Sequence, residues 1–419
     1  SSVTEVKESA FKECSFLAEV EFESPISTIS ESLFMTCVSL TEITIPSSVT
    51  MIEDSAFEKC LNLSKITIPS SVTSIGKSSF SECKSITEIT IPDSVVTIGD
   101  YCFFHCAELK NISIPSSVTS FGSFCFDRCT KLEEFSIPSL VTKIEDYAFN
   151  ECTKLREIII PLSLKYIGDS SFSKCTSFTE ILIPPSLLSI GESAFSGCTS
   201  IKQISIDPYK TKVDPKAFLN CTNLQHFIIN TTQTSIQRFD FQPFSTITNI
   251  TIPENITEIA DSAFQGLSNI RHISIPDSVA TIGKSAFYEC ASLNKIIIPK
   301  YVREIKSSAF AKCSSLTEIG IPSSITSIEV SLFAECTKLQ SITIPPSIDT
   351  INEEAFKKCT SLLYISVPSN VKIIGCSAFE NCTKLKGMNI PSKLQQIKEK
   401  TFCGCSSLEK IIIPPSLGS

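Results

Sequence analysis

The chain has 419 residues, of which 42% are hydrophobic and 19% are charged, and its formal net charge at pH 7 is −8. This apolar content is too high for a disordered chain. The acidic balance argues against binding to a nucleic-acid backbone, because such binding requires a clustered basic face. The longest apolar runs, such as residues 158–160, are too short to span a bilayer, so we expect no insertion into a membrane.

A repeat of 23 residues runs through the whole chain, and its clearest marker is a phenylalanine that recurs eighteen times without an insertion or deletion. These residues are Phe11, Phe34, Phe57, Phe80, Phe103, Phe126, Phe149, Phe172, Phe195, Phe218, Phe241, Phe264, Phe287, Phe310, Phe333, Phe356, Phe379 and Phe402. A constant period of this length is typical of an array in which each unit packs only on its neighbours. The sequence therefore predicts a single solenoid of about eighteen stacked coils over residues 1–419.

One coil runs from Ile68 to Thr90, and its apolar residues alternate as in a short strand with inward side chains. A proline follows this strand in fifteen of the eighteen units and ends it, because proline has no N–H to donate. A second inward pair, Val95 and Ile98 in the next coil, predicts a second extended segment. Gly99 after it, with glycine in six other units, is expected to permit a tight turn.

The segment from each phenylalanine to the cysteine three residues later is predicted to be a single helical turn. So short a helix would not stand alone, so its stability must come from stacking on the coils above and below. Like residues then form ladders, with parallel strands roughly 4.8 Å apart.

Sixteen of the twenty cysteines share one position in the repeat. Their regular spacing is not a zinc pattern, which needs close pairs. Their parallel Cβ vectors also disfavour disulfides, so we expect buried free thiols. Four cysteines lie off this position and are expected to be exposed or paired: Cys102, Cys125, Cys376 and Cys403. Every Ser and Cys is explained by its place in the repeat, so we predict no catalytic residue, no metal site and no cofactor.

The repeat weakens over residues 207–244, where Lys210 and Gln233 stand at positions that are otherwise an inward Val. We expect a loop that bulges from the wall here. Either the repeat has drifted, or the stretch is a local binding feature or a flexible joint. The sequence also begins and ends partway through a repeat, at residues 1–3 and 414–417, which indicates a segment of a longer array.

On each main strand, the residues before and between the inward Ile pair face outward. The position between the pair is mostly Thr or Ser, but it is apolar at Ile159, Leu182 and Ile228, with Ser205 interrupting. The preceding position over the same coils carries Glu134, Glu157, Glu180, Gln203 and His226. One interpretation is a partly shielded sheet face that tolerates Ile. The other is a binding site for a protein partner, formed by an apolar strip with an acidic margin.

The repeat unit Ile-Pro-Ser-Ser-Val-Thr-Ser-Ile-Gly-x-Ser-Ala-Phe-x-x-Cys-x-x-Leu-x-x-Ile-x closely resembles the BspA-like leucine-rich repeat family over the whole chain. The resemblance implies a curved, mainly β solenoid with a parallel sheet on its concave side. It also implies a non-enzymatic surface or secreted protein that adheres to host cells, matrix proteins or other microbes. The alternative is a cytoplasmic scaffold built on the same repeat, which the many thiols favour because they suit a reducing compartment.

Overall fold

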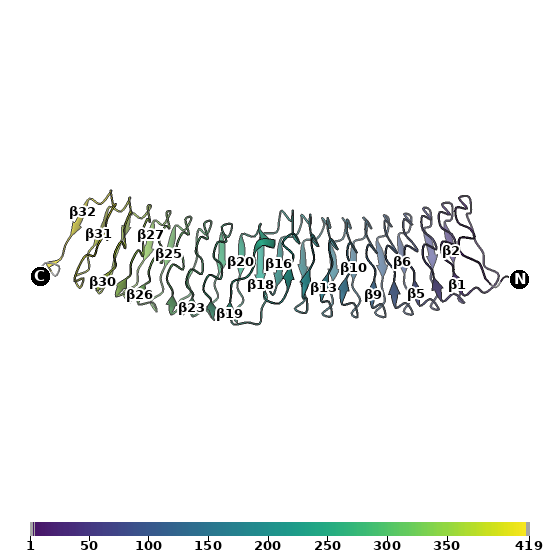
Figure 1. The fold of residues 1–419 in the computed structure, drawn as a ribbon, viewed down its shortest axis with the longest axis horizontal. Helices are drawn as coiled ribbons and strands as arrows, with labels where there is room; N and C mark the ends of the chain where they lie inside the picture. The colour runs from purple at the N-terminus through teal and green to yellow at the C-terminus, as the bar shows by residue number, and fades with distance from the viewer. Residues whose placement is uncertain (1–2, 4, 416–419) are drawn as a thin grey trace. The chain divides into compact units, whose positions relative to one another are not determined.

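The computed structural model describes residue 3 and residues 5–415, and Figure 1 shows the coils that the chain forms. By its internal contacts the chain divides into two units. Unit 1 comprises residues 1–224 and 242–244, and unit 2 comprises residues 225–241 and 245–419. Of the residues at which the sequence begins and ends partway through a repeat, Ser1, Ser2 and those from Ser416 onward lie outside the described part.

Each unit is a β-solenoid, and the described part of the chain makes about 17 turns of about 23 residues with parallel sheets and almost no helix. This confirms the predicted fold class. The one helix among the described elements is a short 3-10 helix, η1 (Gln242–Phe244), with Pro243 in its first turn, where proline is tolerated in helices.

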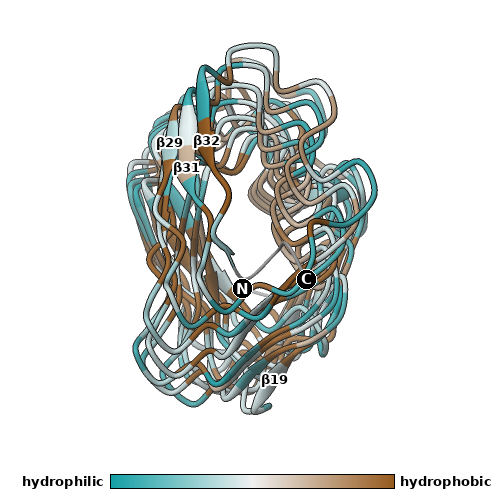
Figure 2. Ribbon diagram, turned by 90° about the vertical axis from the view of Figure 1, so that its left-hand side faces the viewer, coloured by the Kyte–Doolittle hydropathy of each residue, from teal (hydrophilic) through white to brown (hydrophobic). Residues whose placement is uncertain are grey.

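The first wall of the solenoid consists of the main strands with the inward Ile pair. In unit 1 these are β2 (Glu42–Thr44), β4 (Lys65–Thr67), β6 (Glu88–Thr90), β8 (Asn111–Ser113), β10 (Glu134–Ser136), β12 (Glu157–Ile159), β14 (Glu180–Leu182) and β16 (Gln203–Ile206). In unit 2 they are β18 (His226–Ile229), β20 (Asn249–Thr251), β22 (His272–Ser274), β25 (Glu318–Gly320), β27 (Ser341–Thr343), β29 (Tyr364–Ile365), β31 (Gly387–Asn389) and β32 (Lys410–Ile412). Figure 2 shows β29, β31 and β32 side by side, with hydrophobic and hydrophilic segments alternating along the coils.

The second wall consists of two-residue strands at the second extended segment, as predicted. In unit 1 these are β1 (Thr28–Ile29), β3 (Met51–Ile52), β5 (Ser74–Ile75), β7 (Thr97–Ile98), β9 (Ser120–Phe121), β11 (Lys143–Ile144), β13 (Tyr166–Ile167), β15 (Ser189–Ile190) and β17 (Lys212–Val213). In unit 2 they are β19 (Ser235–Ile236), β21 (Glu258–Ile259), β23 (Thr281–Ile282), β24 (Glu304–Ile305), β26 (Ser327–Ile328), β28 (Thr350–Ile351) and β30 (Ile373–Ile374). These strands form several sheets, and within each sheet neighbouring strands pair in parallel and in register, as Ile75 does with Ile98.

The core of each unit contains the predicted ladder of phenylalanine rings. In unit 1 the rings of Phe57 and Phe80 stack with centroids 5.4 Å apart and an interplanar angle of 5°. In unit 2 the rings of Phe287 and Phe310 stack at 5.3 Å and 3°. These rings are fully buried, and their offset stacking adds to the free energy gained by burying apolar surface.

The segment between phenylalanine and cysteine is not a helical turn, so that expectation is wrong. Two residues flanking Phe80, Ser78 and Glu82, have left-handed backbones with φ of 53° and 57°. The N–H groups of Ser78, Phe80 and Glu82 donate to carbonyl oxygens of the next coil at 2.8, 2.9 and 2.7 Å. A helical turn would direct these N–H groups along its own axis, whereas this conformation makes a hydrogen bond to the next coil at every second residue.

Gly99 has a φ outside the left-handed region, so the need for glycine here does not come from a turn. A Cβ at Gly99 would lie 2.5 Å from the backbone nitrogen of Lys77 in the preceding coil. Glycine is therefore needed because successive coils approach each other closely at this position.

Fourteen of the sixteen cysteines in the ladder position are buried, which confirms the predicted burial; Cys14 is exposed and Cys405 is half-buried. The expectation for Cys102 and Cys125 is wrong, since both are buried and free. They stand directly before Phe103 and Phe126, at the inward position that is alanine in many coils. Of the other two off-position cysteines, Cys403 is exposed as expected and Cys376 is half-buried.

In the irregular stretch, the inward polar positions shift along the chain. In unit 1, Lys210 is exposed and Thr211 is buried instead, with its hydroxyl donating to the Leu187 carbonyl at 2.9 Å. In unit 2, Thr231 is buried while Gln233 is exposed. A buried threonine therefore replaces the usual Val in both coils; the Thr211 hydroxyl bonds to the neighbouring coil, whereas the Thr231 hydroxyl accepts a hydrogen bond from the Gln233 N–H of its own coil. The longer polar side chains of Lys210 and Gln233 reach solvent.

Candidate functional site

The candidate site lies on the outer face of the first wall in unit 1, over β10, β12, β14 and β16. Alternation along each strand places Phe135, Ile181 and Ile204 in the core, where at most 4% of their surface is exposed. The residues on either side of them must then face outward. Register is maintained within each pair of strands, because Ser136 pairs with Ile159 and Leu182 pairs with Ser205, whereas β12 and β14 belong to separate sheets.

Two large apolar side chains on this face are exposed to solvent. Ile159 has 58% of its surface exposed and Leu182 has 74%, whereas Ser205 in the next coil is half-buried and interrupts the strip. In the neighbouring coils of unit 1, Thr or Ser occupies this position. Ile159 and Leu182 stand at the same repeat position in successive coils, and a contiguous exposed apolar patch rimmed by polar groups is a mark of an interaction surface.

A row of carboxylates lies beside the apolar side chains. Glu134 pairs in register with Glu157, and Glu180 occupies the same position in the following coil. Within the described residues these three carboxylates form no ion pair, and Glu180 accepts a hydrogen bond from the Gln203 amide at 3.3 Å. Like charges at opposed positions of neighbouring strands are destabilising. The row therefore costs the fold stability in the free protein.

Elsewhere on the same wall the equivalent positions carry opposite charges. In unit 1, Lys65 lies 3.6 Å from Glu42, and in unit 2, Lys295 lies 3.0 Å from Glu318. The repeat thus accommodates a compensating lysine at this position, which makes the three uncompensated glutamates a distinct local feature.

The structure brings six of the eight predicted site residues together in unit 1. The other two, His226 and Ile228, belong to β18 of unit 2. There the His226 Nε2 atom lies 2.8 Å from the Thr251 hydroxyl oxygen, and Ile228 is half-buried. Ile228 is thus less exposed than Ile159 and Leu182, so it offers less apolar surface.

Sequence reasoning missed two exposed leucines in the corner that follows the first wall of unit 1. Leu140 is 56% exposed and Leu162, three residues after Ile159, is 76% exposed. The signal was present, because both stand where the repeat has serine after Ile-Pro. In unit 2, Ile297 and Ile412 stand at the repeat position of Ile159; they are 72% and 68% exposed and were also missed.

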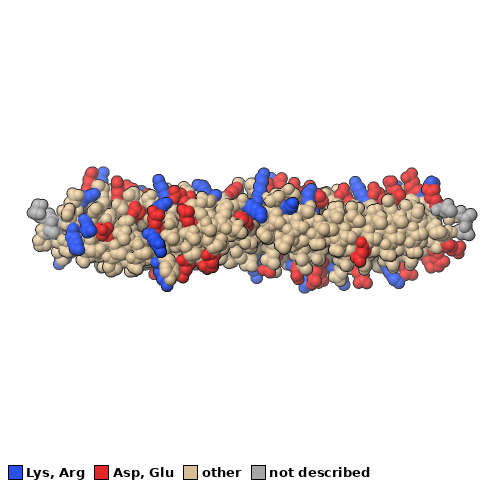
Figure 3. Space-filling view, turned by 90° about the horizontal axis from the view of Figure 1, so that it is seen from below, with Lys and Arg blue, Asp and Glu red and all other residues tan. Residues whose placement is uncertain are grey.

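Charged side chains of both signs are interspersed on the face that Figure 3 shows. Within residue 3 and residues 5–415, no group of three or more His, Cys, Asp and Glu side chains is arranged to hold a metal ion. In the same described part, no helix has the length and apolar character needed to cross a bilayer.

Comparison with known proteins places the whole sequence in one repeat family. The family model described as a BspA type leucine-rich repeat region matches residues 1–109, 50–179, 142–271, 234–363 and 328–419. A search of curated proteins gave no match.

Solved structures of bacterial leucine-rich repeat proteins are similar to this chain. One from Bacteroides ovatus is 28% identical over 94% of this chain and 90% of its own, with a TM-score of 0.44. A protein described as a leucine-rich cell surface protein, from Faecalibacterium prausnitzii, is 30% identical over 72% of this chain and 87% of its own, with a TM-score of 0.39. A leucine-rich repeat protein from T. pallidum is 29% identical over 42% of this chain and 72% of its own, with a TM-score of 0.35.

Proposed function

We propose that this chain, which belongs to the BspA type leucine-rich repeat family, is a non-enzymatic adhesion protein that binds a partner protein at a cell surface or after secretion. The binding face is the outer face of the first wall in unit 1, centred on Ile159 and Leu182. The partner is a host-surface or extracellular-matrix protein.

The observation that carries this proposal is the pairing of exposed apolar side chains with an uncompensated carboxylate row. Ile159 and Leu182 offer the hydrophobic centre of an interface, and Glu134, Glu157 and Glu180 offer its polar rim. A partner with an apolar side chain flanked by Lys or Arg would cover the exposed apolar side chains and neutralise the carboxylates. Binding would thus relieve a charge repulsion that the free protein bears.

The surface location is supported by family membership and by the cell-surface description of the Faecalibacterium relative. The large number of thiols is only weak support for a cytoplasmic scaffold. Fourteen of the sixteen ladder thiols are buried in the core, where an external oxidant does not reach them. A reducing compartment is therefore not required to keep them free.

The test is surface plasmon resonance against a panel of purified matrix proteins, namely fibronectin, laminin and collagen. The double variant Ile159→Ser/Leu182→Ser restores the residue type of neighbouring coils and should keep the fold. We expect the wild-type chain to bind at least one member and the double variant to bind it about tenfold or more weakly.

Ile297→Ser in unit 2 is the matched control, because it removes an isoleucine from the same repeat position that is 72% exposed, against 58% for Ile159 and 74% for Leu182. It should leave the affinity unchanged. Equal affinity of wild type and double variant, with identical circular dichroism, would exclude this face as the site. Binding to no member of the panel would exclude these three matrix proteins as the partner.

A further inference from the structure

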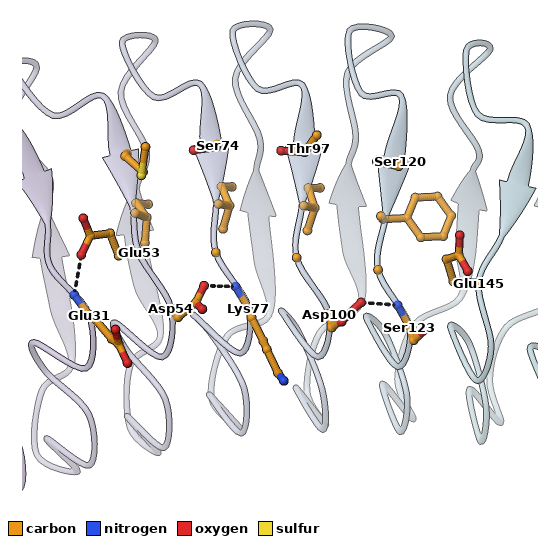
Figure 4. A pocket seen from close by; sticks show the side chains of 18 residues that line it. Glu31, Glu53, Asp54, Ser74, Lys77, Thr97, Asp100, Ser120, Ser123 and Glu145 are labelled. Carbon is orange, nitrogen blue, oxygen red and sulfur yellow. Dashed lines mark hydrogen bonds between the residues drawn. The ribbon is translucent and has the colours of Figure 1, made fainter.

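A groove of about 750 Å³ runs over the second wall of unit 1 (Figure 4). It crosses β3, β5, β7 and β9, and its floor includes Gly76, Gly99 and Gly122 in three successive coils. The small outward side chains of Ser74, Thr97 and Ser120 leave it open to solvent. This groove lies on a different wall from the adhesion face described above.

The floor cannot be filled by a side chain from the floor positions themselves. A Cβ at Gly76 would lie 2.7 Å from the backbone nitrogen of Asp54, and a Cβ at Gly122 would lie 2.4 Å from that of Asp100. Contact between the coils therefore enforces glycine, and three enforced glycines in a row produce a continuous hollow along the stack.

The groove is strongly acidic. Its lining carries five carboxylates, on Glu31, Glu53, Asp54, Asp100 and Glu145, against the single ammonium group of Lys77. The Lys77 side chain extends away from the floor, and its Nζ atom lies 5.8 Å from the centre of the Tyr101 ring. Glu145 forms an ion pair with Lys143, whereas the other four carboxylates form none within the described residues.

Three of these carboxylates are held in place by backbone N–H groups of a neighbouring coil. Asp54 accepts a hydrogen bond from the Lys77 N–H at 2.7 Å, and Asp100 accepts one from the Ser123 N–H at 2.8 Å. Glu53 accepts one from the Glu31 N–H at 2.9 Å. Carboxylates fixed in this way lose little conformational entropy when a cation binds.

We propose that this groove binds an extended polypeptide segment of a partner protein that carries Lys or Arg residues. The charge of the lining selects for cations, and the long open floor accepts a main chain lying along the stack. Asp54 and Asp100 stand two coils apart, which corresponds to roughly 10 Å. Three residues of a polyproline II segment span about 9 Å, so cations at every third residue match this spacing.

The probe is a fluorescein-labelled twelve-residue peptide of Lys-Pro-Pro repeats, with the Glu-Pro-Pro peptide as its counterpart. Proline keeps both peptides extended, so that they differ only in charge. By fluorescence anisotropy with the full chain, we expect saturable binding of the lysine peptide and none of the glutamate peptide. Absence of lysine-peptide binding would overturn the proposal.

Two kinds of variant distinguish binding of the lysine peptide in the groove from its non-specific electrostatic attraction to an acidic protein. Asp54→Asn/Asp100→Asn removes two charges, while the amide oxygens still accept the same backbone hydrogen bonds. Asp169→Asn/Asp261→Asn is its matched control, because both aspartates make the same inter-coil bond, to Glu192 N–H and Lys284 N–H, outside the groove. We expect about tenfold weaker peptide binding for the first pair only.

Thr97→Trp fills the hollow without changing any charge, and Thr281→Trp places the same side chain on the second wall of unit 2. We expect the first to weaken binding about tenfold and the second to leave it unchanged. Equal losses for both aspartate pairs, or unchanged binding by Thr97→Trp, would overturn the proposal. The Ile159→Ser/Leu182→Ser variant should still bind the lysine peptide, so failure of the adhesion face and failure of the groove are distinguishable.

Discussion

The sulfur atom of Cys83 lies 3.1 Å from the carbonyl oxygen of Phe57 in the preceding coil, and donates its S–H to it. The same bond recurs along both units, for instance from Cys152 to Phe126 at 3.1 Å and from Cys313 to Phe287 at 3.2 Å. Each thiol is thus aimed at a backbone oxygen of the coil before it. The cysteine ladder is a set of weak polar links between coils as well as part of the apolar core.

We predict that the buried thiols are reduced and unreactive in the native protein. Burial raises the pKa of Cys60 and of Cys336 to about 12, so very little of the reactive thiolate exists at neutral pH. Reaction with a thiol-specific disulfide reagent should modify the exposed Cys14 and Cys403 first and the buried thiols only after denaturation. If a count in denaturant without reductant finds most of the ladder blocked, the ladder is oxidised and this prediction is wrong.

We predict that Phe172→Ala destabilises its part of unit 1 by about 3–5 kcal/mol, because it removes a buried ring and leaves a cavity. The Phe172 ring stacks on Phe149 and on Phe195, each at 5.3 Å. Phe11→Ala is the control, because Phe11 is 39% exposed and its replacement should lower the free energy of unfolding much less. Hydrogen exchange of the coils around each site measures the local free energy of opening, and equal effects of the two changes would contradict the ladder's role in stability.

We predict that residues 207–244 are the weakest stretch of the array. Coils of a solenoid contact only their neighbours, so local stability is a sum of local terms. Here buried Thr211 and Thr231 replace the usual apolar residue, which reduces the apolar area removed from water. Amides in this stretch should exchange faster than those of the coils on either side. Uniform protection of the amides in this stretch and in the coils on either side would contradict this prediction. It would favour the alternative that the repeat has drifted here without a structural consequence.

The sequence predicted the repeat, both sets of strands and the phenylalanine ladder, because a period of 23 residues forces like residues into register. It did not reveal the left-handed backbone at Ser78 and Glu82, since neither is the glycine or asparagine that usually marks such a conformation. That conformation is required by hydrogen bonds between coils, which no local pattern shows. The burial of Cys102, by contrast, was readable from its place directly before Phe103.

Part of the candidate site was also readable. The exposure of Ile159 and Leu182 follows from alternation along a strand of known register. Alternation along a strand says nothing about Leu162, because Leu162 lies in the corner after the strand, where a side chain is equally free to face solvent. The groove on the second wall was not predictable, because its hollow depends on how closely the coils approach each other at Gly76, Gly99 and Gly122.

We predict that Ser171→Ala stabilises unit 1 whereas Ser79→Ala does not. Both serines are fully buried directly before a ladder phenylalanine. Within the part of the chain that the structure describes, the Ser171 hydroxyl has no hydrogen-bond partner, while the Ser79 hydroxyl lies 3.3 Å from the Cys102 sulfur. A buried unsatisfied hydroxyl costs about 1–3 kcal/mol, so removing that of Ser171 should raise the free energy of unfolding by about 1 kcal/mol. Removing the Ser79 hydroxyl loses a hydrogen bond and should lower the free energy of unfolding. A stabilisation of equal size at both positions would show that the hydrogen bond of Ser79 contributes nothing.

The side chain of Asp127 is buried in unit 1, with one carboxylate oxygen 2.9 Å from the amide nitrogen of Asn150. Burial raises its pKa from 3.8 to about 6, against the opposing effects of the Asn150 hydrogen bond and the Arg128 charge. Between these two values the native state binds more protons at this group than the unfolded state does. The free energy of unfolding must therefore fall as the pH rises across that interval, and it stays lower above it.

Asp127→Asn keeps an acceptor for Asn150 and removes the titration. Its stability relative to wild type, read from hydrogen exchange of residues 124–152, should increase as the pH rises from about 4 to about 6 and then level off. Asp93→Asn is the control, because Asp93 is exposed, and its relative stability should not change with pH in this way. If both variants show the same flat profile, the Asp127 carboxylate is solvated in the native protein, and the packing between Phe126 and Arg128 must be more open than the structure shows.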